Sequence, residues 1–259
     1  MTDTSPCKSS RRTFLAATGL ALGAAAASPL GAAAASPLGA LAQTAGGAPL
    51  KIGTIGAGHE GGALGILYAK AGHPVMFSSR NPEGLKDLVA EAGPTAQAGT
   101  VAQAVAFGDV ILLVVPYPAV EQIARDQGKA LATKALVMDV ANPIALRDGY
   151  AFVKEIEDQG GPGLVTAKLL PGAHIVRAFN AISYRSLAPN AHRSGEPLGV
   201  PIAGDDPKAI AVATSLIKEV GFEPVLVGGL AMGKYLVPGT PLGGEHTSAE
   251  IRQIAATLK

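Results

Sequence analysis

The chain has 259 residues, a formal net charge of +1 and a single Cys. Apolar residues make up 48% of it and charged residues only 16%, so there is ample material for a core. The near-neutral charge argues against a nucleic-acid-binding protein, which needs a basic surface. One Cys excludes a disulfide framework and Cys-based zinc or iron–sulfur sites.

The first forty residues have the pattern of an export signal. Residues 10–15 read S-R-R-T-F-L and precede an Ala-, Leu- and Gly-rich stretch with two copies of G-A-A-A-A-S-P-L. This stretch resembles a twin-arginine (Tat) signal. A membrane span is the alternative, but Pro29, Pro37 and the weak hydrophobicity of the stretch disfavour it. We expect residues 1–42 to be a cleaved twin-arginine signal peptide, with export to the periplasm or another extracytoplasmic space and no stable membrane span after cleavage.

From Leu50 onward, short apolar runs alternate with amphipathic stretches, which is typical of βαβ units and a parallel sheet. Residues 50–55 form the first expected strand, and Gly56, Gly58 and Gly61 follow as G-x-G-x-x-G before an expected helix over 61–71. The first glycine permits a tight turn, the second lets a diphosphate approach the backbone, and the third lets helix and strand pack closely. The motif therefore predicts a dinucleotide site.

The end of the second expected strand, residues 73–77, bears on the choice of dinucleotide. An NAD site would place an acidic residue there, whereas this chain has Ser78, Ser79 and Arg80. A serine hydroxyl and a guanidinium suit the 2′-phosphate of NADP. A solvated turn before an expected helix over 82–92 is the alternative. We expect NADP(H).

The rest of the chain continues the alternation. Further strands are expected at 109–115, 135–140, 174–178, 198–203 and 223–227, and helices at 119–131, 163–170 and 207–220. A capping box at 247–250 predicts a last helix. Since ligands lie beyond the carboxyl ends of parallel strands, the nicotinamide ring is expected beside residues that follow two of these strands. These residues are Val115, Pro116, Tyr117, Asn142 and Pro143.

The predicted fold class is α/β, a Rossmann-type doubly wound parallel sheet with a small C-terminal α/β extension. In domain terms, residues 43–145 form the NADP-binding core, and residues 146–259 complete the sheet and the acceptor side.

Residues 51–238 resemble the NADPH-dependent coenzyme F-420 reductases and the related NADPH-binding domain of the STEAP metalloreductases. The resemblance rests on motifs spread along the chain. They are I-G-A-G-H-E-G-G at 55–62, S-S-R at 78–80, V-V-P at 114–116, D-V-A-N-P at 139–143, L-L-P-G-A-H-I-V-R-A-F-N-A-I at 169–182 and G-D-D-P-K-A at 204–209. The run from Pro171 to Ile182 is the most distinctive, because generic Rossmann domains lack it.

The resemblance implies hydride transfer between NADPH and a flavin-like acceptor: coenzyme F-420, a flavin, or ferric iron through a flavin. It implies that Ala57, Gly58, His59 and Glu60 wrap the diphosphate and that Asn180 lies near the hydride-accepting ring. Because two cofactors carry such chemistry, no catalytic acid or base is expected. The implied binding partner is then a small-molecule redox acceptor, and the formation of a homodimer is left open.

Three alternatives to these expectations stay open. A loop histidine without function explains His59 at least as well as a functional one. The whole chain is alternatively a non-catalytic exported NADP-binding or sensing protein. Reduction of a small carbonyl or imine compound is a third activity, for which the sequence shows no proton donor.

Other residue clusters point less clearly to chemistry. Asp205 and Asp206 look like a carboxylate pair but fit a helix cap before Pro207 better. Arg177 and Arg185 have the charge to bind an anionic acceptor, although surface or structural roles are favoured for each. The five His are scattered without ligand spacing, so no metal site is expected.

Overall fold

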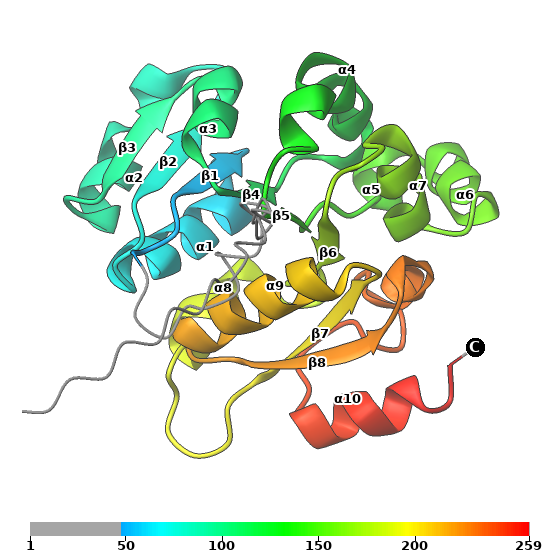
Figure 1. The fold of residues 1–259 in the computed structure, drawn as a ribbon. Coiled ribbons are helices and arrows are strands. Elements are labelled where there is room, and N and C mark those ends of the chain that lie inside the picture. The colour runs from blue at the N-terminus through cyan, green and yellow to red at the C-terminus, as the bar shows by residue number, and fades with distance from the viewer. Residues whose placement is uncertain (1–47, 259) are drawn as a thin grey trace, which may run out of the picture. The chain divides into compact units, whose positions relative to one another are not determined.

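The computed structural model describes residues 48–258, so the expected signal peptide lies outside the described residues. All named strands join one eight-stranded sheet in the order β3-β2-β1-β4-β5-β6-β7-β8 (Figure 1). The strands are β1 (Ile52–Ile55), β2 (Val75–Ser78), β3 (Ala96–Gly99), β4 (Val110–Leu113), β5 (Leu136–Asp139), β6 (Ile175–Arg177), β7 (Gly199–Gly204) and β8 (Glu223–Gly228).

Helices connect these strands. They are α1 (His59–Lys70), α2 (Lys86–Ala92), α3 (Val101–Phe107), α4 (Val120–Leu131), α5 (Ala145–Asp148), α6 (Tyr150–Asp158), α7 (Pro162–Leu169), α8 (Tyr184–Asn190), α9 (Pro207–Glu219) and α10 (Ser248–Ala255), with 3-10 turns η2 (Pro82–Leu85), η3 (Tyr117–Ala119) and η4 (Leu230–Tyr235). No helix within residues 48–258 is both long enough and apolar enough to cross a membrane.

Side chains of the central strands alternate between two apolar cores. In β4, Val110 and Leu112 pack in the core that contains Leu64 of α1, whereas Ile111 and Leu113 pack in the other. This is the period of two expected of a strand buried on both faces. The sheet is therefore covered by helices on both sides, which confirms the predicted Rossmann-type doubly wound fold.

One strand pair departs from the parallel arrangement. β6 pairs with β7 in the antiparallel sense, with Val176 opposite Gly204, while the other neighbouring pairs run parallel. After α8, β7 therefore starts at the same end of the sheet at which β6 stops. β7 and β8 carry a small core of their own, which α10 covers with Ile251.

The predicted elements exist, with shifted boundaries. The first helix begins at His59 rather than Gly61, because Gly58 already serves as its N-cap. The expected helix over 82–92 begins with the 3-10 turn η2. β3, α3, α5, α6 and α8 were not predicted from the sequence.

Candidate functional site

A cavity of about 800 Å³ lies at the carboxyl ends of the central strands. Its walls come from segments 58–61, 114–116, 140–144 and 179–183, which follow β1, β4, β5 and β6, and from residues within 238–245. The sheet order reverses between β1 and β4, and open α/β sheets bind ligands at such a switch point. The volume lies within the range of small-molecule sites.

The glycine turn shapes one wall of this cavity. Gly56 has φ +97°, and a Cβ there would lie 2.3 Å from the Val114 carbonyl oxygen. A Cβ on Gly61 would lie 2.0 Å from the carbonyl oxygen of Gly56. A Cβ on Gly58 would meet nothing within 4 Å, so this glycine leaves space open in front of the loop.

Helix α1 starts at this turn and points its N-terminus toward the cavity wall. Gly58 is its N-cap, and no side chain caps the first turn. The first-turn N–H groups and the positive end of the helix dipole are therefore available to an anion.

The end of β2 supplies a cation beside this turn. Arg80 is exposed, and Ser79 is half-buried, with its Oγ accepting a hydrogen bond from the Asn81 N–H. Ser78 is buried, and its hydroxyl donates to the Thr54 carbonyl oxygen at 2.6 Å. Of the three residues, Ser79 and Arg80 are thus accessible to a ligand, and the Ser78 hydroxyl is engaged by the neighbouring strand.

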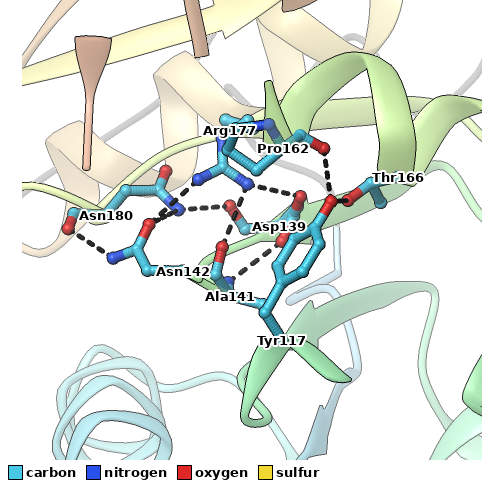
Figure 2. A network of polar contacts seen from close by, with 8 residues as sticks. All are labelled: Tyr117, Asp139, Ala141, Asn142, Pro162, Thr166, Arg177 and Asn180. Carbon is cyan, nitrogen blue, oxygen red and sulfur yellow. Dashed lines mark hydrogen bonds and ion pairs between the residues drawn. The ribbon is translucent and has the colours of Figure 1, made fainter. Parts of the chain in front are cut away.

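A buried polar network forms the floor beneath the cavity (Figure 2). Arg177 Nη1 lies 2.7 Å from Asp139 Oδ2, and neither side chain is exposed. The same guanidinium donates to the Ala141 carbonyl oxygen at 3.0 Å and to Asn142 Oδ1 at 3.0 Å. The pair ties the ends of β5 and β6 together.

The network also orients Asn180. Its Nδ2 donates to the Asp139 carbonyl oxygen at 3.0 Å and to Asn142 Oδ1 at 3.3 Å, and Asn142 Nδ2 donates back to the Asn180 carbonyl oxygen at 2.8 Å. The preceding residue, Phe179, has φ +59°, a left-handed conformation that is costly for an aromatic residue. Asn180 lines the cavity, and its Oδ1 is buried without a hydrogen-bond partner in the described part of the chain. A ligand with an amide N–H fits this acceptor.

Glu60 is the second cavity residue with an unpartnered atom. It lies in the first turn of α1, and its Oε1 is buried without a hydrogen-bond partner. Burial raises the pKa of Glu60 to about 7, although a hydrogen bond from the Tyr184 backbone opposes the change. Beside it, the His59 ring stacks on Tyr184 with the ring centroids 4.7 Å apart.

The structure brings most of the expected site residues to one place. Eight of them line the cavity: Gly58, His59, Glu60, Gly61, Val115, Pro116, Asn142 and Asn180. Seven do not line it: Gly56, Ala57, Ser78, Ser79, Arg80, Tyr117 and Pro143. Tyr117, expected beside the nicotinamide, is buried instead, and its hydroxyl donates to the Pro162 carbonyl oxygen at 2.7 Å. Pro143 is buried behind Asn142, and Ala57 lines a neighbouring hollow with Tyr184.

Several cavity residues were not found from the sequence. Arg147 lines the cavity and donates to the Asn142 carbonyl oxygen at 2.7 Å, and Glu245 lies on the C-terminal wall. Both sit in segments without a recognisable motif. Ser183 also lines the cavity, and it directly follows the distinctive run that ends at Ile182, which could have indicated it.

The other candidate clusters have structural partners. Arg177 is fully buried against Asp139, so the anion-binding alternative for it is wrong and the structural role is confirmed. Asp206 caps α9 by accepting from the Lys208 N–H at 2.8 Å, and Asp205 Oδ1 accepts from the Leu230 N–H at 3.2 Å. Asp206 is therefore a helix cap and Asp205 binds the backbone at the start of η4, so the two do not act as a carboxylate pair. Arg185 is exposed, with its guanidinium 5.5 Å from the Tyr184 ring.

The sheet order, the glycine turn and the cavity at the switch point define a Rossmann-type α/β protein. Residues 51–143 match the family model described as "NADP oxidoreductase coenzyme F420-dependent". The chain is 28% identical over 203 residues to a glycerol-3-phosphate dehydrogenase (NAD(P)+) of Rhizobium etli, with 66% of this chain and 62% of that protein covered. It is 27% identical over 207 residues to the F420-dependent NADP reductase of Methanothermobacter thermautotrophicus, with 74% and 87% covered.

Solved structures show the same fold. A hypothetical protein from Sinorhizobium meliloti superposes with a TM-score of 0.64 at 28% identity, covering 75% of this chain and 93% of that one. A putative F420-dependent NADP reductase from Arthrobacter sp. FB24 gives 0.59 at 20% identity, covering 71% and 87%. The chain spans 62% of the glycerol-3-phosphate dehydrogenase it matches. Over its nucleotide-binding fold, this chain is similar to NAD(P)-dependent oxidoreductases.

Proposed function

We propose that this protein is an NADP(H)-dependent oxidoreductase that transfers a hydride between NADPH and a flavin-like acceptor. One observation carries the proposal: Gly58, at the uncapped N-terminus of α1, and Asn180, whose Oδ1 has no hydrogen-bond partner within residues 48–258, line the same cavity. An anion-binding wall and an amide-binding wall suit the two ends of a nicotinamide nucleotide. The family match over residues 51–143 supports the same cofactor.

The chain offers a place for each part of NADP(H). The turn at Gly56–Gly61 would hold the diphosphate through backbone N–H groups, with Gly58 leaving room for close approach. Ser79 and Arg80 would hold the 2′-phosphate, and no acidic residue stands at this strand end to prefer NAD. Pro116, Asn142 and Asn180 would border the nicotinamide.

These residues contribute to catalysis mainly by positioning the two reacting rings. NADPH, when bound, supplies a hydride, so the protein must hold the nicotinamide and the acceptor ring face to face. Asn180 is suited to this, because Asp139 and Asn142 fix its amide before any ligand arrives. The apolar walls at Val115 and Ile182 would exclude water from the reacting atoms.

Coenzyme F-420 is the first acceptor to test, because the Methanothermobacter relative is an F420-dependent NADP reductase. A flavin is the second, and ferric chelates are the third through the predicted relation to the STEAP NADPH-binding domain. The alternative function, a non-catalytic NADP-binding or sensing protein, predicts tight NADPH binding without turnover.

The test is anaerobic oxidation of NADPH by the purified protein, followed at the NADPH absorbance band. F-420, FMN, FAD and ferric chelates serve as acceptors, and NADH as the control donor. Turnover with one acceptor identifies the activity. Tight NADPH binding with no turnover on any acceptor favours the binding protein, and absence of NADPH binding refutes both.

We also propose export by the Tat route to the periplasm or another extracytoplasmic space. The support is the S-R-R-T-F-L sequence with Arg11 and Arg12 ahead of the Ala-rich stretch. Tat export would let the protein leave the cytoplasm already folded around its cofactor. Fractionation of cells that express the full chain tests this. The Arg11→Lys/Arg12→Lys variant should stay in the cytoplasm, and an unchanged distribution would refute the route.

A further inference from the structure

Glu60 differs from the other acidic residues of the cavity in its surroundings. Its Oε1 is buried without a hydrogen-bond partner among residues 48–258, whereas Glu245, which also lines the cavity, is exposed. A carboxylate oxygen without a donor is costly away from water, and this cost favours the protonated form. The pKa of Glu60 is accordingly raised to about 7.

The charged and titratable groups around Glu60 do not offset this burial. His59 is exposed and stacks on Tyr184, and the guanidinium of Arg185 in α8 lies 5.5 Å from the Tyr184 ring. Across the cavity, the Arg147 guanidinium binds Asp148. The N-terminus of α1 favours a carboxylate, and burial of the carboxyl group acts in the opposite direction.

Binding of a dinucleotide would strengthen this preference. The loop that contains Glu60 is the one proposed to hold the diphosphate, and nearby negative charge raises the pKa of a carboxyl group. Closure of the cavity by a ligand also removes water from Glu60. The carboxyl group would therefore hold its proton at neutral pH when the cofactor is bound.

We propose that Glu60 is the proton donor of the reaction and that the acceptor is one that takes a hydride at a carbon or a ring nitrogen and a proton at a second nitrogen or at oxygen. The inference rests on the proposed function and deepens it, since it narrows the class of acceptor. Glu60 lines the same cavity as Pro116, Asn142 and Asn180, which border the proposed nicotinamide position. It supplies the proton donor that the sequence did not reveal.

The hydride, with its two electrons, would come from the bound reduced nicotinamide and form a bond to a carbon of a C=N or C=O bond, or to a carbon or nitrogen of a ring conjugated with one. The Glu60 O–H bond breaks, and its proton forms a bond to the nitrogen or oxygen. Glu60 becomes a carboxylate and regains a proton from water in the cavity. Ferric iron takes single electrons and no proton, so it does not fit as the direct acceptor.

The experiment compares the wild-type protein with Glu60→Gln, Glu60→Asp and a matched control, Glu155→Gln, which changes an exposed glutamate of α6 outside the cavity. Two readouts are used. Infrared difference spectroscopy detects the protonated carboxyl group and needs no turnover. The pH profile of kcat/KM is measured with F-420, a flavin and a ferric chelate.

The wild-type protein shows a protonated-carboxyl band that disappears as pH rises through about 7 and that Glu60→Gln lacks. Its kcat/KM falls about tenfold per pH unit above the pKa of Glu60. Glu60→Gln still binds NADPH but is slowed about 100-fold or more, without that fall. Glu60→Asp keeps the fall at a lower rate, and Glu155→Gln behaves as wild type.

Two results would overturn the inference alone: turnover of Glu60→Gln at the wild-type rate and pH profile, or turnover with the ferric chelate only. If the wild-type protein fails to oxidise NADPH with any of the three acceptors, the proposed function is refuted, and this inference with it.

Discussion

Arg177 and Asp139 form an ion pair, 2.7 Å from Nη1 to Oδ2, in which neither side chain has any exposed surface. Arg177 is the last residue of β6 and Asp139 is the last residue of β5, so the pair joins two neighbouring strands where the cavity begins. Asn142 Oδ1 accepts a hydrogen bond from the Arg177 guanidinium, and Asn180 Nδ2 donates to the backbone carbonyl oxygen of Asp139. The ion pair therefore positions the floor of the site without facing a ligand.

Replacing one member of this pair should be costly. Arg177→Met leaves the Asp139 carboxylate buried without its cation, and the free energy of unfolding should fall by about 3–5 kcal/mol. Urea unfolding followed by circular dichroism measures it. Arg177→Met combined with Asp139→Asn should recover part of the loss, and Arg252→Met on the exposed face of α10 should change stability by less than about 0.5 kcal/mol. A loss below about 1 kcal/mol for Arg177→Met would contradict this role.

Asn180 should contribute to binding only through the nicotinamide half of the cofactor. Asn180→Ala removes the unpartnered Oδ1 and should weaken NADPH binding by about 0.5–1.5 kcal/mol, the net value of one hydrogen bond. Binding of 2′,5′-ADP, which lacks the nicotinamide, should not change. Fluorescence titration with both ligands tests this, and equal weakening of the two would mean that Asn180 lies elsewhere relative to the cofactor.

Arg80 should decide between the two nicotinamide cofactors. Arg80→Glu replaces a cation at the proposed 2′-phosphate position with an anion, so NADPH binding should weaken by about 1.5–3 kcal/mol or more. NADH has no 2′-phosphate, and its binding should stay the same or improve. Arg252→Glu makes the same charge change far along the chain on α10 and serves as the control. Unchanged NADPH binding by Arg80→Glu would refute the NADP assignment.

Alanine substitutions at two glycines of one turn should affect stability and NADPH binding differently. Gly58 has φ −74° and space around it, so Gly58→Ala should leave stability within about 0.5 kcal/mol while weakening NADPH binding, because its methyl group occupies the open space. Gly56 has φ +97° and a neighbouring carbonyl oxygen in the way, so Gly56→Ala should lose at least about 1–3 kcal/mol of stability. Thermal unfolding and NADPH titration measure both effects, and similar behaviour of the two variants would contradict the distinction.

The sequence predicts those parts of the fold that local chemistry determines. The run of apolar residues in β4 and the capping box Thr247–Glu250 each identify an element without tertiary information. β3 was missed because Ala96–Gly99 has no β-branched residue and is held mainly by pairing with β2. The capping box at Thr100 and Gln103 was a usable signal for α3.

The site was only partly predictable for the same reason. The glycine turn is local, so its residues could be read from spacing. The Arg177–Asp139 pair joins residues 38 positions apart, and the burial of Glu60 depends on α8 packing over α1. Such properties arise from tertiary packing, which spacing along the chain does not encode.

Glu60 should make the stability of the protein depend on pH. Its pKa is about 7 in the folded state against 4.5 for an ordinary glutamate, so the folded state holds this proton more tightly than the unfolded state. The resulting stabilisation is complete below pH 4.5 and is lost as pH rises to about 7. Allowing for partial exposure, the loss should be about 1–3 kcal/mol.

Glu60→Gln carries no titrating group at this position, so it should lack this fall and be more stable than the wild-type protein at pH above about 7. Urea unfolding of both proteins across this pH range measures the difference, with Glu155→Gln as a control that keeps the wild-type dependence. Parallel stability curves for wild type and Glu60→Gln would mean that the carboxylate is already stabilised in the folded protein, and that the proton proposed for Glu60 is not held there.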